Sequence, residues 1–243
     1  MAHITYRYHH VFAYPVTHRV VGVEDLFLVR NLNIIHLTVE VPLNIRYIAF
    51  FVCLLQATLG LSQSKLTQKE AEERFGQVSG VGYDLYLDIT GAKTFSGEST
   101  ITFELKSVNA PLRIDFYQGT VNAVLYNGKK IAHTYDQQAI YIKAKDLKIG
   151  KAEIKVLYTH AFDKDGDGLY RFVDPEDQRV YVWTQFEAFA ANQMFPSFDQ
   201  PDLKAKFKLR VLAPKNWTVV SAVREDALNT QPKGKLWNFP ESL

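Results

Sequence analysis

Strict alternation of apolar and polar residues is the feature that most restricts how this 243-residue chain can fold. In the run GYDLYLDIT, Tyr83, Leu85 and Leu87 share one face, and the run STITFELKS repeats the pattern. Because successive side chains of a strand point to opposite faces, a period of two predicts β-strands. The Gly-bounded segment GAKTFSG separates the two runs, so we expect them to form a hairpin.

Further short runs of the same kind follow at near-regular spacing. They read LRIDFY, VNAVLY, AIYIKA, AEIKVLYTHAF, RVYVWTQFE, KFKLRVLA and TVVSA. The pair Asn127-Gly128 is a strong hairpin-turn signal. One polar segment, SKLTQKEAEERFG at residues 64–76, is compatible with a short helix. We therefore predict an all-β domain of many short antiparallel strands, arranged as a sandwich or a curved sheet.

An uncharged segment, YIAFFVCLLQATLGLSQS, occupies residues 47–64 and follows Arg46. Its strongly apolar part is short and the small residues Gly60 and Ser62 lie near its end, which favours a signal peptide cleaved near Ser62 or Ser64. The segment is also long enough for an uncleaved membrane anchor, and a buried core helix is a third reading. We favour the signal peptide and expect an exported protein: periplasmic, extracellular or attached to the membrane through residues 47–64.

A signal peptide begins close to its own starting methionine, but here residues 1–46 precede the apolar segment. Five of the seven histidines lie there: His3, His9, His10, His18 and His36. Metal binding needs ligands that converge, which this spacing does not supply. We interpret residues 1–46 as an extension without a folded role and residues 65–243 as the β domain.

Composition excludes several classes of function. The net charge is +2 and basic residues form no stripe, so we expect no nucleic acid partner. The single cysteine, Cys53, excludes an internal disulfide framework and a Cys-rich zinc site.

The segment DKDGDGLYRFVD matches the spacing of a calcium loop, with Asp163, Asp165 and Asp167 at its first, third and fifth positions. Such a loop needs a helix on each side and normally ends in Glu. Here the flanks are strand-like and the last position is Asp174. We expect a polar hairpin tip instead.

No catalytic group can be assembled from the residues alone. The serines lack a G-x-S-x-G setting, and beyond residue 64 the histidines are His133 and His160. Neither has a second histidine four residues away on a helix, so the chain contains no His-Glu-x-x-His zinc site. We predict no catalytic residue and no metal ligand in this chain.

The run TQFEAFAANQMFPSFDQPDLKAKF places polar residues among aromatic ones. On a strand, Gln185 and Glu187 would share one face, with Phe186 on the other. A carboxylate in a cleft there would attract an ammonium group, and an amide would add a hydrogen bond. Spacing alone favours solvated surface over such a binding pair.

The ordered motifs GLYRF, TQFE, MFPSFDQPDLKAKF and APKNWTVVSA resemble the N-terminal domain of the aminopeptidase N family. Its members are zinc metallopeptidases that remove residues from peptide N-termini. The resemblance covers about residues 80–243. It implies a saddle-shaped antiparallel β-sheet domain that packs over a thermolysin-like catalytic domain.

The resemblance also assigns roles to residues. Gln185 and Glu187 match the family's T-Q-x-E stretch, in which the Glu binds the α-amine of peptide N-termini. Asn192-Gln193 departs from the family, which commonly has basic residues there. The chain ends at NFPESL, before the family's Gly-x-Met-Glu-Asn loop and zinc helix.

Two functions follow as expectations. The first is the N-terminal domain of a zinc aminopeptidase, inactive alone, with zinc and the catalytic domain supplied by the rest of the polypeptide. The alternative is a non-catalytic β-domain that binds peptides or a partner protein.

Overall fold

The computed structural model describes residues 66–242. Our predictions for residues 1–46 and for the signal peptide or membrane anchor at 47–64 lie outside this range and stay predictions. Within residues 66–242, no helix is long and apolar enough to cross a membrane.

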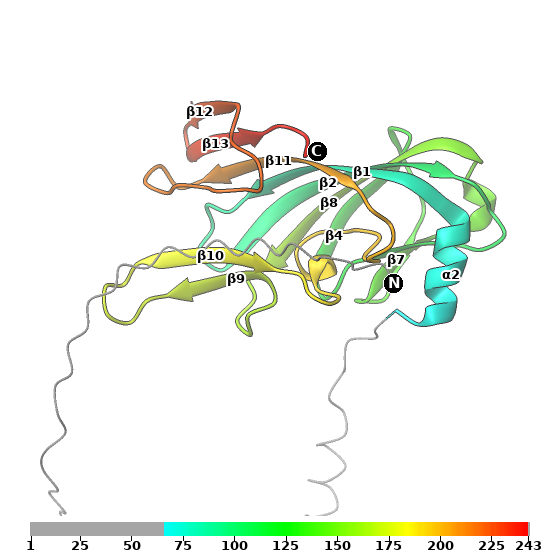
Figure 1. Cartoon of the computed structure of the whole chain (residues 1–243), viewed down its shortest axis with the longest axis horizontal. Coiled ribbons are helices and arrows are strands. Elements are labelled where there is room, and N and C mark those ends of the chain that lie inside the picture. Colours follow the sequence, from blue (N-terminus) through cyan, green and yellow to red (C-terminus); the bar gives the residue numbers. More distant parts are fainter. Residues whose placement is uncertain (1–65, 243) are drawn as a thin grey trace, which may run out of the picture. The chain divides into compact units, whose positions relative to one another are not determined.

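The described chain starts with helix α2 (Gln68–Gln77) and then consists mainly of strands (Figure 1). A capping box begins the helix: Thr67 and Glu70 each bond the other's backbone N–H. The strands are β1 (Val78–Asp88), β2 (Thr94–Leu105), β3 (Leu112–Asp115), β4 (Thr120–Tyr126), β5 (Lys129–Lys130), β6 (Thr134–Tyr135), β7 (Ala139–Ile142), β8 (Gly150–Ala161), β9 (Gly168–Val173), β10 (Val180–Gln185), β11 (Lys206–Ala213), β12 (Ala227–Gln231) and β13 (Gly234–Phe239). Two short 3₁₀ helices are η1 (Ala144–Asp146) and η2 (Ala191–Gln193).

Eight strands form one sheet in the order β12-β13-β11-β1-β2-β8-β4-β5. The predicted hairpin is confirmed as β1–β2, in which Tyr83 pairs with Ile101, although β2 already begins at Thr94 and the turn is shorter than expected. The Asn127-Gly128 turn joins β4 to β5, and both residues have the positive φ that such a turn requires. The predicted all-β fold is therefore confirmed.

Strand direction differs from our expectation at one pairing. Strand β11 runs parallel to β1, with Leu209 beside Leu85, so the described sheets are not purely antiparallel. The predicted strand TVVSA is also wrong: it lies between β11 and β12 without strand structure, and Val220 is 65% exposed. Here β12 and β13 complete the sheet instead.

The core lies on the face of β1, β2 and β8 that carries the alternating apolar residues. Ile101, Leu105 and Ile154 are fully buried there. At Gly97 of β2 an added Cβ would lie 2.4 Å from the ring of Tyr158, so glycine leaves room for this buried ring. Close packing of this kind fixes the two neighbouring strands against each other.

Two smaller sheets accompany the large one. Strands β3, β7 and β6 form the first, and β9 and β10 form the second. Residues 162–167 connect β8 of the large sheet to β9 of the small one, so they are not the hairpin tip that we predicted. Asp174 lies in the separate turn between β9 and β10, where its Oδ1 accepts a hydrogen bond from Glu176 N.

Candidate functional site

Gln185 is the last residue of β10, in the small β9–β10 sheet. It pairs with Gly168, and Trp183 pairs with Tyr170. Because alternate residues of a strand share a face, Gln185 lies on the same face as Tyr181 and Trp183, both of which are exposed. The Trp183 and Tyr170 rings are 4.4 Å apart. Gln185 therefore ends a face that is otherwise aromatic.

Glu187 does not lie on the strand. The strand ends at Gln185, and residues 187–190 form a turn in which Ala190 N donates to Phe186 O at 3.1 Å. Phe186, between the strand and the turn, packs edge-on against the buried ring of Phe195. Our expectation that Gln185 and Glu187 share a strand face is thus wrong, although the two residues flank one strand end. Glu187 is exposed.

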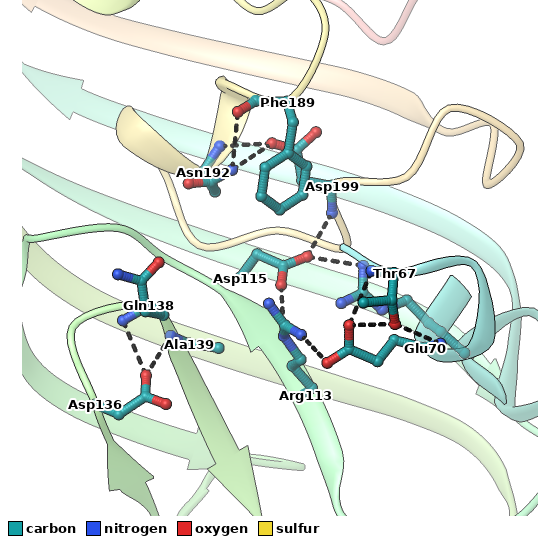
Figure 2. Close-up of polar contacts among 11 residues, drawn as sticks. Thr67, Glu70, Arg113, Asp115, Asp136, Gln138, Ala139, Phe189, Asn192 and Asp199 are labelled. Carbon is teal, nitrogen blue, oxygen red and sulfur yellow. Dashed lines mark hydrogen bonds and ion pairs between the residues drawn. The ribbon is translucent and has the colours of Figure 1, made fainter. Parts of the chain in front are cut away.

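Asn192, in η2, is 1% exposed and follows this turn directly. Its backbone N and its side-chain Nδ2 both donate to Asp199 Oδ2, at 3.0 and 2.7 Å (Figure 2). Burial raises the pKa of the Asp199 carboxyl above its usual value, while the two Asn192 hydrogen bonds oppose the shift. A neutral amide therefore solvates this carboxylate.

The backbone of Asp199 contacts a network of ion pairs centred on the buried Asp115. Asp199 N donates to Asp115 Oδ2 at 3.2 Å, and the same oxygen lies 2.7 Å from Arg74 Nη1. The other Asp115 oxygen is 2.9 Å from Arg113 Nε, and Arg113 in turn reaches Glu70 at 2.6 Å (Figure 2). The network joins α2, β3 and the segment that carries Asp199.

Backbone bonds attach the same segment to the sheets. Asp115 and Ser197 exchange two hydrogen bonds between their main chains, at 2.8 and 3.0 Å. Ser99 Oγ donates to Pro196 O, and Phe198 N donates to the buried Tyr83 hydroxyl. Residues 196–199 are therefore fixed to β2, β3 and β1.

Sequence reasoning missed Arg74, Arg113 and Asp115. In the sequence each of them looks like an ordinary polar residue of a helix or strand. The one visible signal was the acidic residue within the apolar run LRIDFY, which is unusual for a strand with a buried face.

The histidines and acidic residues that the structure describes do not form a metal site. Within residues 66–242, no group of three or more His, Cys, Asp or Glu side chains could hold an ion. His160 is buried, and its two ring nitrogens face the carbonyl oxygens of Ala161 and Tyr117. His133 is exposed and bonds Ile131 O. The residues of this range therefore do not fit a catalytic zinc ion.

The acidic segment also lacks the geometry of a calcium loop. Asp163 Oδ2 accepts from Leu169 N at 3.1 Å, and Asp163 lies beside Tyr170 in the middle of β9. Asp174 follows the end of β9, four residues or about 13 Å further along the strand, so the two carboxylates cannot close around one ion.

An open cavity of about 690 Å³ lies between α2 and the connection from β2 to β3. Glu70, Arg74, Arg113 and Tyr141 line it with neighbouring residues. Neither Gln185 nor Glu187 belongs to its wall, and the Arg74 and Arg113 guanidinium groups are already paired with Asp115. The candidate site is therefore the strand end with Gln185 and Glu187, not this cavity.

Comparison with known proteins decides the family. Residues 80–243 match the family model described as the Peptidase M1 N-terminal domain. The chain belongs to the M1 peptidase family. The resemblance to the aminopeptidase N family is thereby confirmed.

Individual M1 relatives agree with this assignment. The chain is 35% identical to the aminopeptidase N of Streptomyces lividans over 179 residues, which cover 72% of this chain and 20% of that protein. It is 32% identical to the aminopeptidase N of Lactobacillus delbrueckii subsp. lactis over 130 residues, or 52% of this chain and 15% of the relative. The chain thus spans about a fifth or less of the length of these relatives.

A solved structure supports the M1 fold. The M1 zinc metallopeptidase from Deinococcus radiodurans matches with a TM-score of 0.53 and 20% identity. The match covers 67% of this chain and 38% of that chain. Residues 80–242 therefore have the architecture of the N-terminal β domain of an M1 peptidase.

Proposed function

We propose that this chain acts as the N-terminal domain of a zinc aminopeptidase, and that Gln185 and Glu187 bind the free α-amino group of the peptide substrate. The observation that carries the proposal is the strand end itself. There an amide ends the strand, a carboxylate begins the turn, and a buried network holds the segment that follows the turn.

Charge explains the choice of ligand. A peptide N-terminus is an ammonium group, for which a carboxylate is the natural partner, and Gln185 offers a neutral acceptor beside it. An exposed ion pair contributes little, because water screens it. Glu187 is exposed in this chain. It becomes an effective binding group once a second domain covers the site and excludes water.

We place that second domain, with its zinc ion, on the same polypeptide. One face of β9 and β10 carries the exposed rings of Phe172, Tyr181 and Trp183 and adjoins Gln185, which supports packing of such a domain. When bound, zinc would supply the Lewis acid for peptide hydrolysis. The part played by this chain is to bind and orient the amine end.

Domain exchange tests the proposal. Residues 66–242 would replace the matching domain of the Streptomyces lividans aminopeptidase N, and release of amino acid from an aminoacyl reporter would be measured alongside zinc content. We expect the 243-residue chain alone to be inactive and the exchanged enzyme to hydrolyse the reporter. A folded, zinc-loaded exchange enzyme without activity would contradict the proposal and favour the non-catalytic peptide-binding alternative.

A further inference from the structure

We infer that Asn192 and Asp199 are positioning residues: their hydrogen-bonded pair holds the turn of residues 187–190, and with it Glu187, in one orientation relative to Gln185. The inference rests on the proposed function, since orienting Glu187 matters for catalysis only if Glu187 binds the amine.

The Asn192 side chain contacts both sides of the junction. Its Nδ2 donates to Asp199 Oδ2 at 2.7 Å and to Phe189 O at 3.5 Å (Figure 2). Phe189 belongs to the turn that carries Glu187. The backbone carbonyl of Asn192 accepts from Tyr117 N at 2.9 Å, so the residue is bound to a third segment as well. One buried amide thus connects the turn to Asp199.

Asp199 is itself immobilised. Its backbone N donates to Asp115, which pairs with the buried Arg74, and the preceding Phe198 N donates to the Tyr83 hydroxyl. On the other side the turn ends at Ala190, which is 2% exposed. The pair therefore links an exposed turn to a part of the structure that cannot shift without breaking buried ionic contacts.

Loss of the hydrogen bond between Asn192 and Asp199 should affect only the neighbouring segment. Hydrogen bonds to a charged acceptor are stronger than neutral ones, and burial makes the Asp199 carboxylate depend on its donors. If the Asn192 side-chain amide is removed, Asp199 keeps the bond from Asn192 N but loses the bond from Nδ2, and Phe189 O in the turn loses its side-chain donor. The contacts of residues 196–199 with β1, β2 and β3 do not involve that amide, so we expect the loss to be concentrated in residues 186–193.

Hydrogen exchange on the full 243-residue chain tests this inference without any assumption about catalysis. In Asn192→Ala, we expect amides in peptides covering residues 186–193 to exchange about 10-fold faster, the equivalent of losing one hydrogen bond. Peptides from β1 and β2 should be unchanged. Unchanged exchange in residues 186–193 would overturn the inference.

Two further variants separate positioning from general destabilisation. Asp199→Asn keeps an acceptor oxygen for Asn192 and should retain most of the protection, whereas Asp199→Ala should lose it. Asn238→Ala is a matched control, because the Asn238 amide also donates to backbone carbonyls, those of Ala227 and Leu236. It should speed exchange in β12 and β13 and leave the turn unchanged. Loss of protection in Asp199→Asn equal to that in Asp199→Ala would contradict the assigned contact.

A double-mutant cycle in the domain-exchange enzyme tests the link to Glu187. Asn192→Ala should lower kcat/KM for peptides with a free N-terminus about 5- to 10-fold and add little when Glu187 is already alanine. A loss that persists undiminished in the Glu187→Ala background would show a structural role only and overturn the inference. If Glu187→Ala has no effect of its own on kcat/KM, the proposed function fails. The hydrogen-exchange measurement on Asn192→Ala still decides whether Asn192 orders the turn.

Discussion

The guanidinium of Arg74 lies 2.7 Å from the carboxylate of Asp115, and their side chains are only 4% and 1% exposed. The pair joins helix α2 to strand β3. Arg113 occupies the other Asp115 oxygen, so this carboxylate is held from both sides. Removing one partner of such a pair leaves a buried charge without compensation.

Asp115→Ala should therefore lower the free energy of unfolding by about 3–5 kcal/mol, because Arg74 would stay buried without its partner. Urea denaturation measures the change. Asp84→Ala is the control, since Asp84 pairs with Arg210 at 3.0 Å on the surface, where such pairs contribute about 0.2–1 kcal/mol. Equal losses in the two variants would mean that the Asp115 network is not effectively buried.

Gly97→Ala should destabilise the domain by about 1–3 kcal/mol, because its new methyl group would overlap the buried Tyr158 ring. Gly76→Ala should have the opposite sign. That position lies in α2 with open space around it, and alanine favours a helix by up to about 1 kcal/mol. Thermal unfolding measures the change in stability of both variants. A Gly97→Ala variant as stable as the wild type would contradict the packing of β2 against the Tyr158 ring of β8.

Asp163 should make stability depend on pH. Burial raises the pKa of its carboxyl to about 6, and the nearby His160 and the Leu169 N–H only partly oppose the shift. The folded state therefore binds a proton more readily than the unfolded state, so this group's contribution to stability is present at low pH and is lost as the pH rises through about 6.

Asp163→Asn tests this dependence, because it keeps an acceptor for Leu169 N and removes the charge. The variant should be more stable than the wild type near neutral pH, by on the order of 1 kcal/mol once solvent screening is allowed for. Its advantage should vanish near the ordinary aspartate pKa. Urea denaturation curves of both proteins, at neutral pH and near the ordinary aspartate pKa, measure this difference in stability. A stabilisation that does not change with pH would refute the raised pKa of Asp163.

Calcium should not bind tightly to residues 163–174. Asp163 lies beside Tyr170 in the middle of β9, whereas Asp174 follows the end of that strand, so the segment cannot supply ligands to one ion from both ends. Titration calorimetry on the full chain should show no micromolar binding. Micromolar binding that disappears in Asp165→Ala would contradict this expectation.

The fold was predictable from sequence because alternation records which face of a strand is buried. In β1, Tyr83, Leu85 and Leu87 are all buried as expected. Alternation does not record strand direction, and β11 pairs with β1 from more than a hundred residues away. Strand β12 was missed because it lies at the sheet edge and is mostly exposed, so its sequence carries little apolar pattern.

The candidate site was predictable only in part. The resemblance singled out Gln185 and Glu187, but the alternation of polar and apolar residues continues through Phe186 and Ala188, so it did not show that the strand ends at Gln185 and a turn follows. The partners of Asp199 come from three separate segments, at Arg74, Asp115 and Asn192. Such tertiary contacts leave no local pattern in the sequence.

The most direct test of the central claim is the discrimination between free and blocked peptides by Glu187→Ala in the domain-exchange enzyme. A charge-assisted hydrogen bond to the substrate ammonium contributes about 1.5–3 kcal/mol, so kcat/KM for free peptides should fall about 10- to 150-fold. Gln185→Ala should cost less, because its amide is neutral. Peptides with a blocked N-terminus should be poor substrates of the wild type and nearly insensitive to the change. If Glu187→Ala discriminates between free and blocked peptides as the wild type does, Glu187 is surface and does not bind the amine.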